Sequence, residues 1–211
     1  MRSVEVWIDH LVLAVPSLSS GIVHVEGLTG VEPVPGGSHP GVGTHNALLS
    51  LGAPTYLEVI APDPEQTGLQ VRSFGLEDPP TAPRLVAFAV GCADLDATVA
   101  MLRAVGHEDV ADPYAMTRRR PDGVELAWRL AMIGRRVGGA HPFLIAWDGG
   151  ASPALDSPLG GRFVALRAGD PDAASSAELL STLGVDVPVE TADAEWLMAT
   201  IETSAGPVTI G

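Results

Sequence analysis

The segment Gly43-Thr44-His45-Asn46-Ala47-Leu48-Leu49-Ser50-Leu51-Gly52-Ala53-Pro54-Thr55-Tyr56-Leu57-Glu58-Val59-Ile60 contains two apolar runs separated by a Gly/Pro turn. Short apolar runs bounded by turn-forming residues predict a β-hairpin. Glu58 lies inside the second run, where an ionised carboxylate is unstable unless a cation or hydrogen-bond donors replace its hydration. We therefore expect a positively charged partner for Glu58.

The turn of this hairpin decides which side chains share a face with Glu58. We predict a turn with an even number of residues, which pairs strand positions whose numbers add to an odd value. In that register His45 lies on the same face as Glu58. The strand-like run from Val6 to Val15 adds a second imidazole at His10. The sequence thus places three candidate ligands in one structural unit.

The composition argues against two classes of partner. The chain has 211 residues, of which 46% are hydrophobic, so it can bury a sizeable core. Its net charge of −14 repels the phosphate backbone of nucleic acids. No apolar stretch reaches the roughly 20 residues that span a bilayer, and Glu5 and Asp9 interrupt any signal-peptide core. We predict a cytoplasmic protein with no nucleic-acid or membrane partner.

One order of elements recurs three times along the chain. The glycines that end the predicted helices are nearly evenly spaced, at Gly30, Gly106 and Gly184, which indicates an internal repeat. We therefore predict three βαβββ units, at residues 1–75, 84–148 and 160–211. Within them, the Gly/Pro-rich residues 34–43 predict a loop, and Asp170 followed by Pro171 predicts the start of the third helix.

A repeated βαβββ unit with a histidine in its first strand and a glutamate in its fourth resembles the vicinal oxygen chelate superfamily. This superfamily includes glyoxalase I, bleomycin-resistance proteins and extradiol dioxygenases. The likeness to its glyoxalase-like group rests on Ile8-Asp9-His10-Leu11-Val12, Gly43-Thr44-His45-Asn46-Ala47-Leu48, Tyr56-Leu57-Glu58-Val59-Ile60, Arg120-Pro121-Asp122-Gly123 with Trp128, and His141-Pro142-Phe143-Leu144-Ile145-Ala146-Trp147. It covers residues 5–148 with specific motifs and residues 160–211 only as a repeat.

The resemblance implies an α+β fold in which tandem βαβββ modules place curled mixed sheets edge to edge and form a cup. A third, partial βαβββ-like module follows. Family members usually take metal ligands from two modules, but Leu85 and Ile145 stand here at the positions that correspond to His10 and Glu58. A divalent metal ion (Zn, Ni, Mn or Fe) must then be held by His10, His45 and Glu58. The alternative is a buried hydrogen-bonded pair of His10 and Glu58 without metal.

The function implied by the resemblance is that of a metal-dependent glyoxalase-like lyase or isomerase. Two imidazoles and a carboxylate suit these ions and leave coordination positions for two adjacent oxygens of a small substrate. Glu58 is also the expected catalytic carboxylate. The alternative is a protein that sequesters a small molecule in the same cup without metal. The sequence lacks a second glutamate at the matching position, which argues against glyoxalase I itself.

The remaining predicted residues contact the substrate. Alternation along a strand sends Arg119 to one face of the sheet and its neighbours Arg118 and Arg120 to the other. A guanidinium binds carboxylate or phosphate through its planar fork, and we expect Arg119 to reach the cup. The other predicted contacts are Asn46, Tyr56 and Trp128. His39 lies in the Gly/Pro segment, where we expect a surface side chain. Because cups form from pairs of modules, we expect units one and two to make the cup. The third unit then packs against their sheet or completes a second sheet with another subunit, which favours a homodimer.

Overall fold

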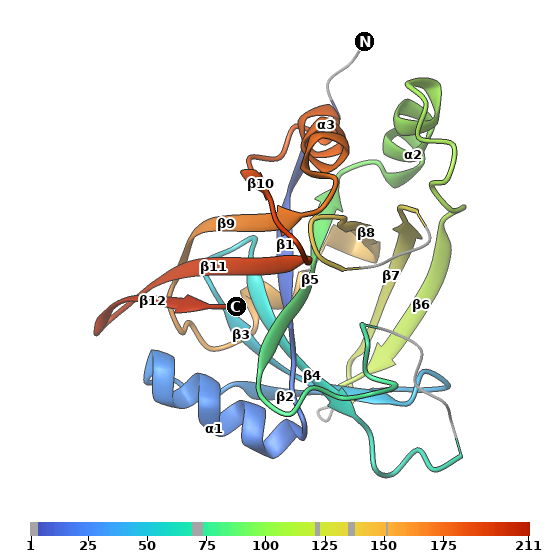
Figure 1. Ribbon diagram of the computed structural model, residues 1–211. Coiled ribbons are helices and arrows are strands. Elements are labelled where there is room, and N and C mark those ends of the chain that lie inside the picture. Colours follow the sequence, from blue (N-terminus) through green and yellow to red (C-terminus); the bar gives the residue numbers. More distant parts are fainter. Residues whose placement is uncertain (1–3, 69–73, 121–122, 135–137, 151) are drawn as a thin grey trace.

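The computed structural model describes residues 4–68, 74–120, 123–134, 138–150 and 152–211, and in it three βαβββ runs follow one another (Figure 1). The first run comprises β1 (Val6–Ala14), α1 (Leu18–Thr29), β2 (Val34–His39), β3 (Thr44–Ser50) and β4 (Tyr56–Pro62). The second comprises β5 (Arg84–Cys92), α2 (Leu95–Ala104), β6 (Tyr114–Arg119), β7 (Glu125–Met132) and β8 (Phe143–Trp147). Two short 3-10 helices, η1 (Asp148–Gly150) and η2 (Pro153–Leu155), lead to the third run, which comprises β9 (Arg162–Asp170), α3 (Ala173–Leu183), β10 (Val189–Thr191), β11 (Trp196–Thr203) and β12 (Gly206–Ile210). Pro121 and Asp122, part of the Arg120-Pro121-Asp122-Gly123 motif, lie outside the described residues.

The first two runs form one curled sheet of eight strands in the order β2-β3-β4-β1-β5-β8-β7-β6. The runs join where β1 pairs with β5 in antiparallel orientation, and the edge strands β2 and β6 pack against each other (Figure 1). Two glycines make this approach possible. A Cβ on Gly36 would lie 2.5 Å from Nη1 of Arg118, and one on Gly37 would lie 2.7 Å from the backbone oxygen of Arg119.

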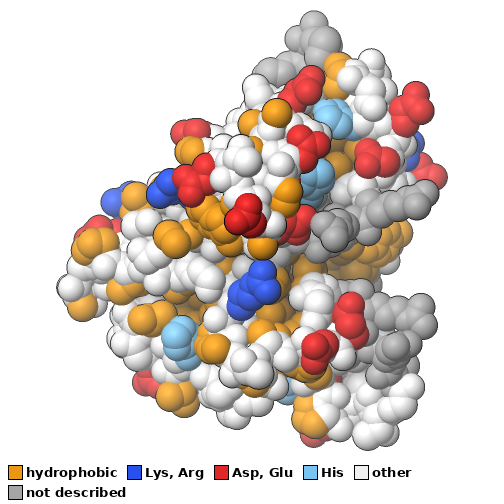
Figure 2. Space-filling model, in the orientation of Figure 1, with side chains coloured by type: hydrophobic (Ala, Val, Ile, Leu, Met, Phe, Trp, Pro, Cys, Tyr) orange, Lys and Arg blue, Asp and Glu red, His pale blue; other side chains and the backbone are white. Residues whose placement is uncertain are grey.

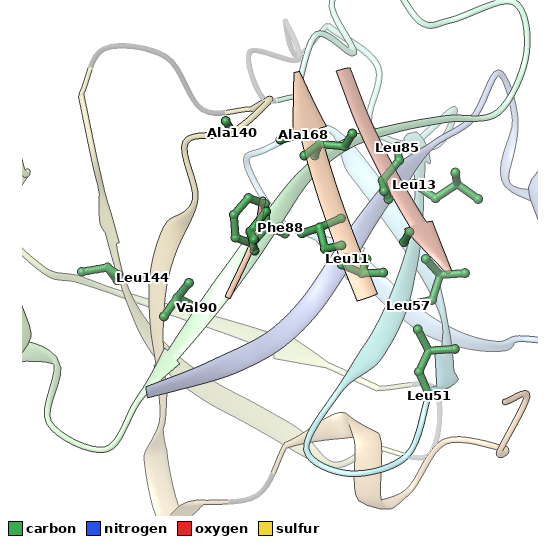
Figure 3. Close-up of a cluster of buried hydrophobic side chains, with 14 of the residues drawn as sticks. Leu11, Leu13, Leu51, Leu57, Leu85, Phe88, Val90, Ala140, Leu144 and Ala168 are labelled. Atoms are coloured by element: carbon green, nitrogen blue, oxygen red, sulfur yellow. The ribbon is translucent and has the colours of Figure 1, made fainter. Parts of the chain in front are cut away.

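Alternation of side chains divides the sheet into an outer and an inner face. On β1, Leu11 and Leu13 belong to the outer core, whereas Val12 and Ala14 belong to a separate inner cluster. The outer core also contains buried residues of all three helices. Helices α1 and α2 pack on the outside of the curled sheet, and α3 packs on β9, β10 and α2. Figure 3 shows Phe88 within this outer core. The inner face is therefore left to form a concave site.

The third run forms its own four-stranded sheet, in the order β10-β9-β11-β12. Leu166 of β9 and Leu197 of β11 belong to the same outer core as the strands of the first sheet, and β11 packs against β5. The third run therefore packs on the outer face of the eight-stranded sheet and does not contribute to its concave side. Its other face leaves Val164 and Met198 exposed, and Figure 2 shows hydrophobic side chains at the surface over β9 and β11.

The predicted start of the third helix at Asp170 is wrong. The N-cap is Asp172, whose side chain accepts a hydrogen bond from the backbone N–H of Ser175. Asp170 is instead the last residue of β9, where it pairs with Thr191 and its carboxylate accepts hydrogen bonds from the Asp172 N–H and the Ser176 hydroxyl. This strand pairing delays the helix by two residues.

None of the helices in the described parts of the chain is long and apolar enough to cross a bilayer.

The segment predicted as a loop, residues 34–43, contains the edge strand β2. It pairs with β3 from Val34 to His39, and the register shifts between Pro35 and Gly37. A shift of this kind is a bulge, and edge strands tolerate both proline and bulges because one side of the strand needs no ladder partner. The prediction failed because it counted Gly and Pro as breakers without allowing for an edge position. As a result, His39 lies in the sheet.

Cys92, at the end of β5, is expected to be unreactive in the folded protein. Burial raises the pKa of its thiol to about 11. At pH 8 about one thiol in a thousand is then ionised, and the thiolate is the reacting form. We expect a disulfide reagent such as DTNB to modify the native chain at least about 100-fold more slowly than the unfolded chain. Equal rates in the two states would contradict this burial.

Candidate functional site

The inner face of the eight-stranded sheet encloses a cavity of about 190 Å³. Most of its polar lining comes from the first run, with His10, His39, Thr44, Asn46 and Glu58 on four neighbouring strands. The wall from the second run is mainly apolar and aromatic, and it includes Met116, Trp128, Leu130, Phe143, Ile145 and Trp147. Among the described residues of that wall, Arg118 carries the only charge. The cavity therefore has a polar end and an apolar end.

The register of the β3–β4 hairpin selects the residue that accompanies Glu58. Ser50 pairs with Tyr56 and Leu48 with Glu58, so paired positions add to an even value and the predicted register is wrong. The physical reason is a turn with an odd number of residues, 51–55, between the paired strand ends. Asn46 consequently lies on the cavity side with Glu58. His45 faces the other way, with Nδ1 4.0 Å from Oδ1 of Asp63.

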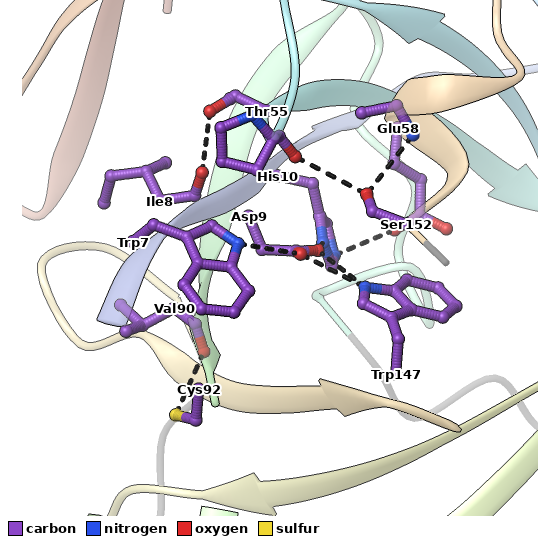
Figure 4. Close-up of polar contacts among 12 residues, drawn as sticks. Trp7, Ile8, Asp9, His10, Thr55, Glu58, Val90, Cys92, Trp147 and Ser152 are labelled. Atoms are coloured by element: carbon purple, nitrogen blue, oxygen red, sulfur yellow. Dashed lines mark hydrogen bonds and ion pairs between the residues drawn. The ribbon is translucent and has the colours of Figure 1, made fainter. Parts of the chain in front are cut away.

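His10 is oriented by a buried carboxylate. Its Nδ1 lies 2.7 Å from Oδ1 of Asp9, and Oδ2 of the same carboxylate accepts hydrogen bonds from the indole N–H groups of Trp7 and Trp147 (Figure 4). A register shift in β1 between Ile8 and His10 leaves Asp9 unpaired with β5. Because the carboxylate is the acceptor, the proton belongs on Nδ1 of His10. Nε2 lies 3.7 Å from Oε2 of Glu58.

His39 has an equivalent arrangement on the other side of Glu58. Its Nδ1 lies 2.8 Å from the hydroxyl oxygen of Thr44, and its Nε2 lies 3.8 Å from Oε1 of Glu58. Two imidazoles thus present Nε2 to the two oxygens of one carboxylate. Sequence reasoning missed His39 because it treated residues 34–43 as a loop. The available signal was the short Gly/Pro segment between His39 and Thr44, which is typical of a hairpin connection.

A hydrogen-bonded chain links Glu58 to the opposite edge of the sheet. The amide N–H of Asn46 donates to Oε1 of Glu58, and Nη1 of Arg118 donates to the amide oxygen of Asn46. Arg118 is 3% exposed, whereas Arg119 is exposed and does not line the cavity. The predicted alternation along the arginine run holds, but the choice of Arg119 is wrong. On β6, Met116 and Arg118 share the face that turns to the cavity.

The electrostatic surroundings keep Glu58 ionised. Burial raises the pKa of its carboxyl, but His10, His39, the Asn46 hydrogen bond and Arg118 together outweigh burial, so the pKa lies below its ordinary value. Burial lowers the pKa of His39 despite the opposing effect of Glu58. At neutral pH His39 is therefore a neutral imidazole, and its Nε2 lies 3.3 Å from the amide nitrogen of Asn46.

The side chains of His10, His39 and Glu58 are of the chemical types that bind divalent metal ions. Two imidazole nitrogens and a carboxylate are ligands that Zn and other first-row ions accept. The separations of 3.7 and 3.8 Å from Glu58 to the two Nε2 atoms are somewhat wider than the roughly 3 to 3.5 Å expected for neighbouring ligands of one ion. In the described parts of the chain, no group of three His, Cys, Asp or Glu side chains meets the spacing of a metal site. The Asn46 amide also contacts both Glu58 and His39.

The structure brings together most of the residues predicted from the sequence. His10, Asn46, Tyr56, Glu58 and Trp128 line the cavity. Tyr56 stacks on the His10 ring with their centroids 4.6 Å apart. His45 and Arg119 lie elsewhere, and His39, Arg118 and Asp9 are the site residues that the sequence prediction did not include.

Comparisons with known proteins agree with this architecture. The sequence pattern of a family described as "Glyoxalase-like domain" matches residues 8–204. The crystal structure of a hypothetical protein from Staphylococcus aureus is 15% identical, covers 98% of this chain and 85% of that chain, and has a TM-score of 0.67. A Streptomyces coelicolor methylmalonyl-CoA epimerase in complex with 2-nitronate-propionyl-CoA is 20% identical, covers 70% and 98% of the two chains, and has a TM-score of 0.48. No curated protein matches the chain. At 15% identity, the likeness to the Staphylococcus aureus structure concerns the fold alone.

Proposed function

Because the chain belongs to the glyoxalase-like domain family, we propose that its cavity is the active site of a small-molecule enzyme that uses a divalent metal ion. His10, His39 and Glu58 would hold the ion. One observation carries the proposal: both imidazoles present Nε2 to Glu58 while Nδ1 contacts Asp9 or Thr44. Such Nδ1 contacts orient metal-binding histidines and fix their tautomer.

The reaction we propose is a proton transfer next to a carbonyl group, as in an isomerase or a lyase. A divalent ion bound here would act as a Lewis acid on two adjacent substrate oxygens. Glu58 is ionised at neutral pH and accepts the proton from the neighbouring carbon. The Asn46 amide N–H, now bonded to Glu58, is placed to stabilise a developing oxyanion. The aromatic wall provides an apolar surface for the rest of the substrate.

A second function is favoured by a specific observation. The chain from Glu58 through Asn46 to Arg118 already supplies the buried carboxylate with a hydrogen-bond donor and an indirect counter-charge. This arrangement needs no metal ion to be stable. A protein that sequesters a small molecule in the same cavity, without metal and without turnover, is therefore the alternative.

The metal content of two matched histidine variants separates these functions. We expect the wild-type chain, purified without chelator and offered Zn, Ni, Mn or Fe(II), to retain about one ion per chain. His39→Ala is expected to lower metal affinity at least about 10-fold, because it removes one ligand of three. His45→Ala serves as the control, since His45 lies on β3, which pairs with the β2 strand of His39, but faces away from Glu58.

Two results would count against the metal site. One is wild-type protein that retains no ion at any concentration offered, which favours the sequestering function. The other is an equal loss of metal in His39→Ala and His45→Ala, which would contradict the register-based assignment.

The oligomeric state of the same preparations, measured by size-exclusion chromatography with light scattering, tests the predicted homodimer.

A further inference from the structure

Arg118, a residue of the cavity wall, has a hydrogen-bond donor without a partner in the described parts of the chain. Its side chain lines the cavity and is 3% exposed, and its Nη1 is bonded to Asn46. Its Nε is fully buried and has no hydrogen-bond partner among the residues that the structure describes. A buried N–H without an acceptor destabilises a folded protein, so such groups are rare and call for an explanation.

The surroundings of Arg118 favour an anion as the missing partner. The side chain is held between the β2 glycines and the cavity, because Gly36 and Gly37 leave room for the guanidinium and its stem. Its contact with Glu58 is indirect, through the Asn46 amide, so no carboxylate of the described residues is hydrogen-bonded directly to the guanidinium. A carboxylate binds guanidinium through two parallel N–H···O bonds, which would use the donor that is left free.

We propose that Arg118 binds the carboxylate of the substrate, which makes the natural ligand a small carboxylic acid with an apolar body. The apolar body follows from the wall of the second run, which places Trp128, Phe143 and other apolar side chains opposite the polar end. This inference rests on the proposed function only in using the same cavity, because it requires neither a metal ion nor turnover. Arg118 acts as a specificity-determining residue in both the enzyme and the sequestering protein.

The test compares acids with amides of the same shape. Phenylacetate, 3-phenylpropionate and hexanoate are titrated against their primary amides by isothermal titration calorimetry, with EDTA present and then with Zn²⁺. We expect the wild-type protein in EDTA to bind at least one acid about 10-fold or more tightly than its amide. Arg118→Gln should lose this preference, and Arg118→Lys should keep part of it because the charge remains.

Arg119→Gln is the matched control, because it removes the neighbouring exposed arginine of the same strand, and it should leave the preference unchanged. The inference is overturned if the wild-type protein binds no acid, if acids and amides bind equally in EDTA, or if Arg118→Gln keeps the preference. A preference that needs Zn²⁺ and is insensitive to Arg118→Gln would support the metal function while refuting this inference. A preference in EDTA that depends on Arg118 supports the inference even if the protein never binds metal. The comparison of acids and amides on the wild-type chain holds whether or not the variants fold.

Discussion

Glu58→Gln is expected to lower the rate of proton transfer in the cavity by at least about 100-fold, the usual contribution of a general base. Gln has nearly the same shape as Glu, but its amide cannot accept a proton from carbon and cannot balance the charge of a metal ion. The measurement is deuterium exchange from D₂O into an aromatic 2-keto acid such as phenylpyruvate, followed by proton NMR and corrected for spontaneous exchange. This probe has two adjacent oxygens and an acidic hydrogen next to its carbonyl.

The control for this experiment is Glu26→Gln on α1. It makes the same chemical change at an exposed position that is not part of the cavity. Its exchange rate should equal that of the wild-type protein. Metal content is measured on the same samples, because loss of the ion and loss of the base would both slow exchange. A Glu58→Gln protein that is folded and exchanges within about twofold of wild type would exclude Glu58 as the base.

The fold could be predicted from the sequence because the patterns that indicate its helices and strands are local and recur along the chain. Helix-ending glycines and strand alternation recur in each run, and the match to the glyoxalase-like family over residues 8–204 confirms the resemblance drawn from short motifs. The predicted α+β fold with a curled sheet is confirmed by the strand order and by the Staphylococcus aureus structure. The start of α3 was missed because strand pairing at Asp170, a long-range interaction, overrides the local capping signal.

The candidate site was harder to predict from the sequence, because the residues that face the cavity depend on whether the hairpin turn has an odd or an even number of residues. One residue more or less in the β3–β4 turn exchanges every side chain between the cavity and the outer core. The sequence does not fix the number of turn residues, so it did not distinguish His45 from Asn46 as the neighbour of Glu58. The same applies to the arginine run, where alternation was predicted but the choice between Arg118 and Arg119 required the register of β6.

His39 and Asp9 were missed for a different reason. Each lies on a strand with a bulge. The bulge of β2 lies between Pro35 and Gly37, before His39, and the bulge of β1 is at Asp9 itself. Bulges re-aim side chains and are common next to active sites, but a regular pattern of alternation does not predict them. Asp9 therefore became interpretable only when the strand pairings were known, whereas the Gly/Pro connection after His39 already indicated a strand for that residue.

Phe88→Ala is expected to destabilise the protein by about 3 to 5 kcal/mol. Phe88 is fully buried on β5, the strand that joins the two halves of the eight-stranded sheet (Figure 3). The cost includes the lost burial of the ring and the cavity that remains, because surrounding strands are fixed by their hydrogen bonds and relax only in part. For a chain of this size the melting temperature should fall by roughly 6 to 20 °C, measured by calorimetry.

The same experiment tests whether the third run folds with the rest of the chain. Leu166 and Leu197 of the third run belong to the same buried cluster as Phe88, so no separate core divides them from the first sheet. We therefore expect one cooperative transition, shifted as a whole by Phe88→Ala. Val23→Ala, at a position on α1 that is 68% exposed, removes apolar atoms from the surface and should change stability by no more than about 0.5 kcal/mol. Two separate transitions, of which only one responds to Phe88→Ala, would show instead that the third run is an independently stable unit.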